Sequence, residues 1–236
     1  MDWESLRSAA HAWQYSPEEL SPQALRERYS SWLSAEERRC GNERRTDRLR
    51  HDYLTARLLC RAVLSSYTGV DPRSWSFRTG LYGKPYVCEP SEFRSLHFSL
   101  TRTRGLVVCL VSRTGELGVD AEETSRPLDV GRIASHFLSA AEHARLCNLP
   151  AQRRNARFFE QWVLKEAYAK GIGRGLAHSP DRLTVESDDD GRPLPIDEWQ
   201  FSLYHPSAYH VAATAVRAGP AAPAVPVRWM TARGLF

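Results

Sequence analysis

The sequence has few cysteines and no long apolar run among its 236 residues. No stretch approaches the roughly 18 consecutive apolar residues of a membrane span, and the residues after Met1 lack the basic and then apolar order of a signal peptide. The five cysteines form no Cys-x-x-Cys pair, so neither a disulfide framework nor a zinc site is indicated. We expect a cytoplasmic protein with reduced cysteines and no membrane partner.

Lysine is also scarce. Only three of the 32 basic residues are lysines (Lys84, Lys165 and Lys170), and the other 29 are arginines. Chance is one explanation of so small a number, and a coding bias that spares lysine where a compact point charge is needed is the other. The net charge of +4 is compatible with an anionic ligand or an acidic partner but is too small to indicate nucleic-acid binding.

The composition, with 42% hydrophobic and 25% charged residues, is that of a protein with a hydrophobic core, and an internal repeat indicates how that core is organised. The segment Trp32-Leu-Ser-Ala-Glu-Glu-Arg recurs as Phe137-Leu-Ser-Ala-Ala-Glu-His. Three further blocks recur in the same order, beginning at Tyr53 and Phe158, at Gly83 and Gly191, and at Phe98 and Phe201. Coincidence between amphipathic helices is the alternative, and the repeat favours two similar halves.

Each half is expected to begin with helices. Ser34 and Ser139 are each followed three residues later by glutamate, which is typical of a capping box at the start of a short helix. Longer helices are predicted over about 48–66 and 152–170, with Gly69 and Gly171 as stops. The sequence Gly171-Ile-Gly-Arg-Gly is expected to be a turn and not a phosphate loop, because phosphate loops precede helices.

Strands are expected after these helices, so the fold class is α+β. The predicted strands are Trp75–Thr79, Leu96–Leu100, Leu106–Ser112, Glu116–Ala121, Leu183–Glu186, Glu198–Leu203 and Tyr209–Val216. The halves would occupy residues 1–115 and 116–217. A Pro/Ala-rich tail over 218–236 and much of the first fifteen residues are expected to be extended and to carry little function.

Two acidic residues at the end of a predicted strand are candidate metal ligands. Side chains alternate along a strand, so Asp120 and Glu122 share one face. Hard oxygen ligands at this spacing suit Mg²⁺, with Mn²⁺ as a possible substitute, and such ions complete their coordination with water and substrate phosphate. A solvated turn is the commoner explanation of such a pair on its own.

The second long helix adds an acid and an amine on a face that should be buried. Phe159, Val163, Glu166 and Lys170 lie at helical spacing on one side. A surface pair of Glu166 and Lys170 is the alternative. At an interface between the halves, Glu166 would provide a third metal oxygen and Lys170 a cation for phosphate.

Four motifs occur in order: Gly83-Lys-Pro-Tyr, His97-Phe-Ser-Leu-Thr-Arg-Thr, Gly118-Val-Asp-Ala-Glu and Trp162-Val-Leu-Lys-Glu-Ala-Tyr-Ala-Lys. Over about residues 30–215 the chain resembles the Sfp-type 4′-phosphopantetheinyl transferases, whose hallmarks are a Gly-Val/Ile-Asp-x-Glu strand and a Trp-x-x-Lys-Glu-x-x-x-Lys helix. This resemblance implies a pseudo-twofold duplication, in which a monomeric pseudo-dimer of two α+β halves holds the site at their interface.

The resemblance also implies the reaction. Phosphopantetheine would pass from coenzyme A to a serine hydroxyl of an acyl or peptidyl carrier protein, with release of adenosine 3′,5′-bisphosphate. Asp120, Glu122 and Glu166 would hold Mg²⁺, Lys170 would stabilise the charge that develops on the phosphate oxygens, and Glu166 would accept the serine proton. The nucleophile would belong to the carrier, and the sequence leaves open which carrier or pathway is served.

Contacts with coenzyme A are implied by the same matches. Arg78, Thr79 and Lys84 match the segment that contacts the adenosine and 3′-phosphate, and Lys165 of the motif helix is a further candidate. An additional phosphate-binding arginine is expected within residues 38–57, and its identity stays open.

One motif departs from the family pattern. The family usually has Asn-x-Ser-His-Ser where this chain has Ser99-Leu-Thr-Arg-Thr. Arg102 replaces a histidine and makes the cation permanent, while Thr101 keeps a hydroxyl group. The missing amide at Ser99 leaves the shape of the pocket and its tolerance for acylated coenzyme A open.

Two other functions are compatible with parts of the sequence. A metal-dependent phosphodiesterase or nuclease would explain the acids but not the repeat. A non-catalytic module that binds RNA or another anion would explain the arginines, but the sequence lacks a pattern of interleaved aromatic and basic residues.

Overall fold

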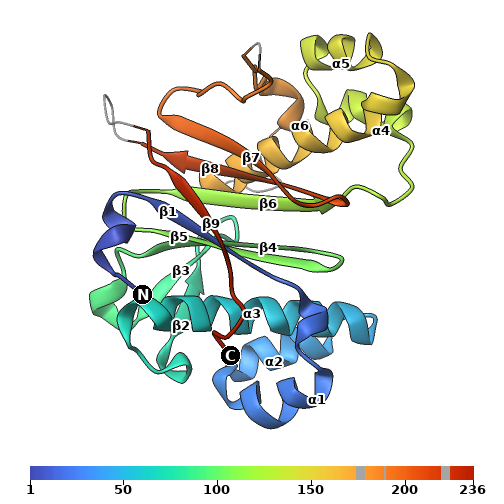
Figure 1. The fold of residues 1–236 in the computed structure, drawn as a ribbon. Helices are drawn as coiled ribbons and strands as arrows, with labels where there is room; N and C mark the ends of the chain where they lie inside the picture. The colour runs from blue at the N-terminus through green and yellow to red at the C-terminus, as the bar shows by residue number, and fades with distance from the viewer. Residues whose placement is uncertain (174–178, 189, 219–223) are drawn as a thin grey trace.

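A computed structural model shows two stacked halves, each with one long helix packed on a β-sheet (Figure 1). It describes residues 1–173, 179–188, 190–218 and 224–236. In the N-terminal half, α3 (Asp47–Thr68) covers a four-stranded sheet, and in the C-terminal half, α6 (Ala151–Gly171) covers a three-stranded sheet. The sheets face each other, so the layers run helix, sheet, sheet, helix, and the expected α+β class is confirmed.

The two sheets are built from strands that are far apart in the chain. The N-terminal sheet has the order β4 (His97–Thr103), β5 (Leu106–Ser112), β1 (Ala10–Tyr15) and β9 (Val227–Thr231). The C-terminal sheet has the order β6 (Leu117–Glu123), β8 (His210–Arg217) and β7 (Trp199–Ser207), and β2 (Ser76–Thr79) and β3 (Pro85–Glu89) form a separate hairpin. All neighbours are antiparallel except β1 and β9.

Shorter helices connect these elements. They are α1 (Pro22–Ala24), α2 (Ala35–Asn42), α4 (Val130–Phe137) and α5 (Ala140–Cys147). Single 3₁₀ turns lie at Glu4–Arg7, Pro17–Glu19, Ser30–Trp32, Pro72–Ser74, Ser91–Phe93 and Pro180–Arg182, and a π turn lies at Leu25–Tyr29. None of the helices in the described ranges is long and apolar enough to cross a membrane.

The predicted helix signals are confirmed. Ser34 and Ser139 both cap a helix, and in each case the glutamate three residues on completes the capping box. α3 ends at Gly69, whose φ of 73° is in the left-handed region that favours glycine. α6 ends at Gly171, where a Cβ atom would lie 2.5 Å from the Trp199 ring. The end of the predicted glycine turn, residues 174 and 175, lies outside the described residues.

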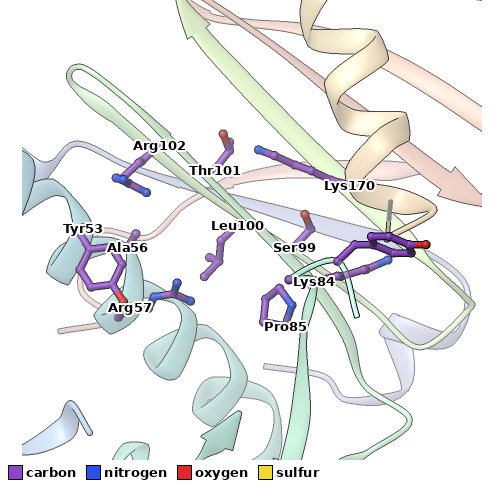
Figure 2. A pocket seen from close by; sticks show the side chains of 13 residues that line it. Tyr53, Ala56, Arg57, Lys84, Pro85, Ser99, Leu100, Thr101, Arg102 and Lys170 are labelled. Atoms are coloured by element: carbon purple, nitrogen blue, oxygen red, sulfur yellow. The ribbon is translucent and has the colours of Figure 1, made fainter. Parts of the chain in front are cut away.

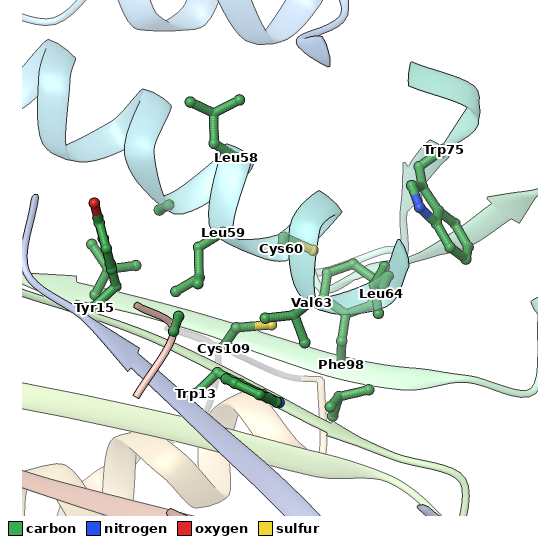
Figure 3. Packing of buried hydrophobic residues seen from close by; sticks show 14 of the residues in the cluster. Trp13, Tyr15, Leu58, Leu59, Cys60, Val63, Leu64, Trp75, Phe98 and Cys109 are labelled. Atoms are coloured by element: carbon green, nitrogen blue, oxygen red, sulfur yellow. The ribbon is translucent and has the colours of Figure 1, made fainter. Parts of the chain in front are cut away.

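The strand β5 is buried on both faces, which explains its unbroken apolar sequence. Val107, Cys109 and Val111 belong to the core beneath the N-terminal sheet, where α3 packs (Figure 3). Leu106 and Leu110 belong to the core between the two sheets. Alternation along one strand therefore joins the halves through a continuous apolar layer.

Both chain ends contain extended segments, as predicted, but these segments are paired in a sheet, which the sequence did not indicate. β1 is an internal strand of the N-terminal sheet and pairs with β5 and β9. β9 adds the last residues of the chain to this sheet, and Ala232 just after it is fully buried. The segments Ala10–Tyr15 and Val227–Thr231 are therefore parts of the fold. Local sequence did not reveal this, because parallel pairing between β1 and β9 depends on residues more than two hundred positions apart.

The predicted strand Leu183–Glu186 is wrong. Its backbone groups form hydrogen bonds with side chains of helices instead. The Leu183 carbonyl accepts a hydrogen bond from Lys165, and the Val185 amide donates one to Glu142. With these groups satisfied, the segment does not pair with a neighbouring strand. An isolated bridge between Ser187 and Pro193 lies nearby.

A similar buried ion pair ties the short helix to the long helix in each half. The N3 glutamate of the capping box pairs with a cation of the long helix, Glu37 with Arg61 at 2.8 Å and Glu142 with Lys165 at 2.6 Å. Each cation also donates to two backbone carbonyls further along the chain. These carbonyls belong to Pro72 and Trp75 in the first half and to Pro180 and Leu183 in the second.

Candidate active site

A cavity of about 230 Å³ lies where the two halves meet (Figure 2). Its walls come from α3, from the β2–β3 turn, from β4 and from the end of α6. Predicted site residues that line it are Lys84, Ser99, Thr101, Arg102 and Lys170. Tertiary structure thus brings residues from three of the four motifs to one opening, while Asp120, Glu122 and Glu166 are not among the residues that line it.

The strand β6 and the helix α6 carry the acidic residues, and their backbones are in contact. A Cβ atom on Gly118 would lie 2.0 Å from the carbonyl oxygen of Ala167, so only glycine fits. This contact sets Asp120 and Glu122, which follow on the same strand face, beside Glu166 and Lys170 of the helix. The strand face with Asp120 and Glu122 and the helix face with Glu166 and Lys170, both predicted from sequence, therefore face each other.

Asp120 is close enough to both glutamates to raise their pKa values, in addition to the effect of burial. Burial raises the pKa of Glu122 to about 7, with Asp120 adding to the shift and Arg126 and Lys170 opposing it. The pKa of Glu166 is also raised, first by burial and then by Asp120, with Lys170 opposing. A cation bound among these carboxylates would relieve the repulsion.

Asp120 is held by two hydrogen-bond donors. The Lys170 ammonium donates to Asp120 Oδ1 at 2.7 Å, and the Thr101 hydroxyl donates to the same oxygen at 2.9 Å. The ammonium also donates to the Val119 carbonyl at 3.1 Å. Glu122 pairs with Arg126 at 3.4 Å. The donor set of carboxylate oxygens suits a hard divalent ion, although no three such side chains in the described ranges form a ready-made metal cage.

Three arginines contact the ring of Tyr53 at the other end of the cavity, and two of them, Arg57 and Arg102, line the cavity. The guanidinium groups of Arg44, Arg57 and Arg102 lie 4.6, 5.0 and 5.5 Å from the centre of the Tyr53 ring. Desolvation, followed by the charges of Arg44 and Arg57, lowers the pKa of Arg102. Asp52 is a nearby acid that opposes this shift. Convergent positive charge over an aromatic face forms an attractive site for an anion.

The sequence indicated an arginine within residues 38–57 but did not identify Tyr53 as the centre of the cluster. Tyr53 and Arg57 lie one helical turn apart on α3, a spacing that places them on one face. That spacing was the available signal. The approach of Arg102 from β4 could be seen only in the folded chain.

Lys84 joins the two halves across the cavity. Its ammonium donates to the Gly171 carbonyl at the end of α6 at 2.5 Å, and burial lowers its pKa. A cation there also suits the negative end of the helix dipole. Arg78 and Thr79 do not line this cavity but an adjacent one of about 440 Å³, which shares Tyr53 and Arg57 with the first.

The position of Lys165 corrects the prediction that it contacts coenzyme A. Its side chain is 2% exposed and points away from the cavity, into the C-terminal half. There it pairs with Glu142 and donates to two backbone carbonyls. Adjacent residues of a helix point in directions about 100° apart, so Lys165 and Glu166 cannot face the same site.

Comparisons with known proteins show which proteins this chain is similar to. A family model described as the 4′-phosphopantetheinyl transferase superfamily matches residues 116–219. The 4′-phosphopantetheinyl transferase HetI of Nostoc sp. is 26% identical over 212 residues, which cover 89% of each chain. The 4′-phosphopantetheinyl transferase Sfp of Bacillus subtilis is 29% identical over 166 residues, which cover 70% of this chain and 71% of Sfp.

A solved structure matches part of the chain. It is a holo-(acyl-carrier-protein) synthase from Bacillus anthracis in complex with coenzyme A, with 23% identity over 44% of this chain and 96% of that chain. Its TM-score is 0.39. The sequence relatives and the family model confirm the resemblance read from the motifs: residues 116–219 match the 4′-phosphopantetheinyl transferase superfamily, and most of the chain is similar to transferases of that family.

Proposed function

We propose that this protein transfers the 4′-phosphopantetheine group from coenzyme A to a serine hydroxyl of an apo acyl or peptidyl carrier protein. The observation that carries the proposal is one cavity lined at one end by Arg57 and Arg102 and at the other by Lys170, which donates a hydrogen bond to Asp120. Arginines in the cavity and a carboxylate beside it suit a substrate with several phosphates and a bound cation. The similarity to 4′-phosphopantetheinyl transferases supports the same reaction.

Coenzyme A would be held chiefly by fixed cations. Arg44, Arg57 and Arg102 around Tyr53 would bind its phosphates. Arg44 and Arg57 are then the candidates for the phosphate-binding arginine expected within residues 38–57. Lys84 lines the same cavity. Arg78 and Thr79, together with Ser99, would complete the contacts from the adjacent cavity and from β4.

Asp120, Glu122 and Glu166 would hold Mg²⁺, or Mn²⁺ in its place. The raised pKa values of Glu122 and Glu166, caused first by burial and then by the charge of Asp120, support this assignment, because buried carboxylates beside another acid gain most from a bound cation. A bound ion would neutralise charge on the diphosphate of coenzyme A.

The protein residues would then move one proton and stabilise one leaving group. The carrier serine oxygen forms a bond to the phosphorus of the phosphopantetheine, and the bond from that phosphorus to the adenosine bisphosphate oxygen breaks. Glu166 would accept the serine proton, directly or through a water, and its raised pKa favours that role. Lys170 would stabilise charge on the bridging and leaving oxygens.

The two halves would derive from a duplication and act as a monomeric pseudo-dimer in the cytoplasm. The recurring capping boxes and buried glutamate-cation pairs support this reading. Light scattering of the purified protein tests the monomer, which a stable dimer would contradict.

Intact mass of an apo carrier protein tests the reaction. After incubation with coenzyme A, Mg²⁺ and this protein, the carrier should gain one phosphopantetheine group. A phosphodiesterase would instead cleave coenzyme A without modifying the carrier, and release of adenosine 3′,5′-bisphosphate with an unchanged carrier mass would favour that function. No modification of several different carriers would contradict the proposal.

A further inference from the structure

Three hydroxyl side chains link the two sheets beside the candidate site. β4 belongs to the N-terminal sheet and β6 to the C-terminal sheet, and alternate residues of β4 reach across to β6. Ser99 Oγ accepts a hydrogen bond from the Val119 amide at 3.2 Å, and Thr103 Oγ1 accepts one from the Glu123 amide at 3.1 Å. Between them, Thr101 donates to Asp120.

Thr101 differs from its two neighbours because its partner is a carboxylate. Its side chain is buried, at 7% exposed, and its hydroxyl lies 2.9 Å from Asp120 Oδ1. Lys170 donates to that same oxygen from the opposite half at 2.7 Å. Two donors on one oxygen fix the rotation of the carboxylate and leave Oδ2 to other partners.

We propose that Thr101 is a positioning residue that orients the Asp120 carboxylate for metal binding, and is not a contact for coenzyme A. The inference rests on the proposed function, in which Asp120 is a metal ligand. Hydrogen bonds to a metal-binding carboxylate hold it in place, and their loss costs about 10-fold to 100-fold in metal affinity.

Thr101→Val tests this role because valine keeps the shape and removes the donor. Mn²⁺ binding to the full chain, followed by electron paramagnetic resonance, should weaken by about tenfold. The Mg²⁺ concentration for half-maximal transfer should rise by a similar factor, while the KM for coenzyme A stays within about twofold. Thr101→Ser keeps the hydroxyl and should retain wild-type metal binding.

Thr103→Val is the matched control. It also removes a hydroxyl that links β4 to β6, but the partner of that hydroxyl is the backbone amide of Glu123. It should lower thermal stability about as much as Thr101→Val and leave Mn²⁺ binding unchanged. If Thr101→Val does not fold, Thr101→Ala offers the same loss of donor in a smaller side chain.

A raised KM for coenzyme A with unchanged Mn²⁺ binding would make Thr101 a substrate contact and would overturn the inference. Equal losses of Mn²⁺ binding in Thr101→Val and Thr103→Val would overturn it too. They would indicate that any lost hydrogen bond between β4 and β6 disturbs the metal site. If the wild-type protein modifies no carrier, the proposed function fails, and the Mn²⁺ titration still measures the link between Thr101 and Asp120.

Discussion

Gly118 lies against Ala167 so closely that a Cβ atom on the glycine would be 2.0 Å from the alanine carbonyl oxygen. The clash is with helix backbone, which cannot rotate away. We therefore expect Gly118→Ala to push α6 from β6, to cost about 3 kcal/mol or more of folding free energy and to abolish transfer. Urea unfolding and the carrier mass assay measure both effects.

Gly131→Ala serves as the control for this prediction. Gly131 lies inside α4, and an added Cβ would have only an ordinary contact, 3.5 Å from Asp129 Oδ1. The change should raise stability by up to about 1 kcal/mol, because alanine favours helix. Wild-type stability and transfer rate in Gly118→Ala would contradict the backbone contact.

Glu166→Gln should reduce transfer by about 10²-fold to 10⁴-fold, because it removes the proposed base and one metal ligand together. The rate should be measured at saturating coenzyme A over a range of Mg²⁺ concentrations. Glu160→Gln, on the same helix and paired with Arg157 near the surface, should have little effect. A near-normal rate in Glu166→Gln would refute the assignment.

The raised pKa of Glu122 predicts a dependence of stability on pH in the metal-free protein. Its carboxyl titrates at about 7 in the fold and near its ordinary value of 4.5 when unfolded. Its contribution to stability is therefore complete below pH 4.5 and is lost as the pH rises through about 7. Glu122→Gln, which stays neutral, should gain stability relative to wild type between pH 5 and pH 8 when urea unfolding is followed in a chelator. Parallel pH profiles for the two proteins would argue against this titration.

Arg102 stays charged near neutrality, so its own contribution to coenzyme A binding should not change with pH. Arg102→Ala should raise the KM for coenzyme A, and an unchanged KM would mean that this residue does not contact the substrate. Arg102→His should bind well at pH 6 and weaken as the pH rises through about 6.5, the usual pKa of histidine. Measuring KM from pH 6 to pH 8 for the wild type and both variants distinguishes these outcomes.

Lys165→Met should destabilise the protein without changing the KM for coenzyme A. It leaves Glu142 buried without its ion-pair partner, and breaking a buried pair typically costs about 3–5 kcal/mol. Arg145→Ala breaks the pair of Arg145 with Glu186, which is about half exposed, and should cost at most about 1 kcal/mol. A raised KM in a stably folded Lys165→Met protein would restore Lys165 as a coenzyme contact.

Local sequence was sufficient to predict the long helices and to predict which charged side chains share one face of a strand or helix. The capping boxes at Ser34 and Ser139 depend on residues only three positions apart, and the glycine stop at Gly69 depends on its own backbone conformation. Periodicity likewise placed Asp120 with Glu122 on one strand face and Glu166 with Lys170 on one helix face. These features follow from short-range geometry, which is why the family motifs can be recognised in the amino-acid sequence by itself.

Tertiary structure decided which of these residues meet. Three contacts join segments from different parts of the chain. Lys165 pairs with Glu142 in the C-terminal core, Thr101 donates a hydrogen bond to Asp120, and Arg102 approaches the ring of Tyr53. The pairing of β9 with β1 does the same for the two chain ends. Such contacts depend on how helices and sheets pack, and packing is determined by the whole set of buried side chains and not by the spacing within one segment.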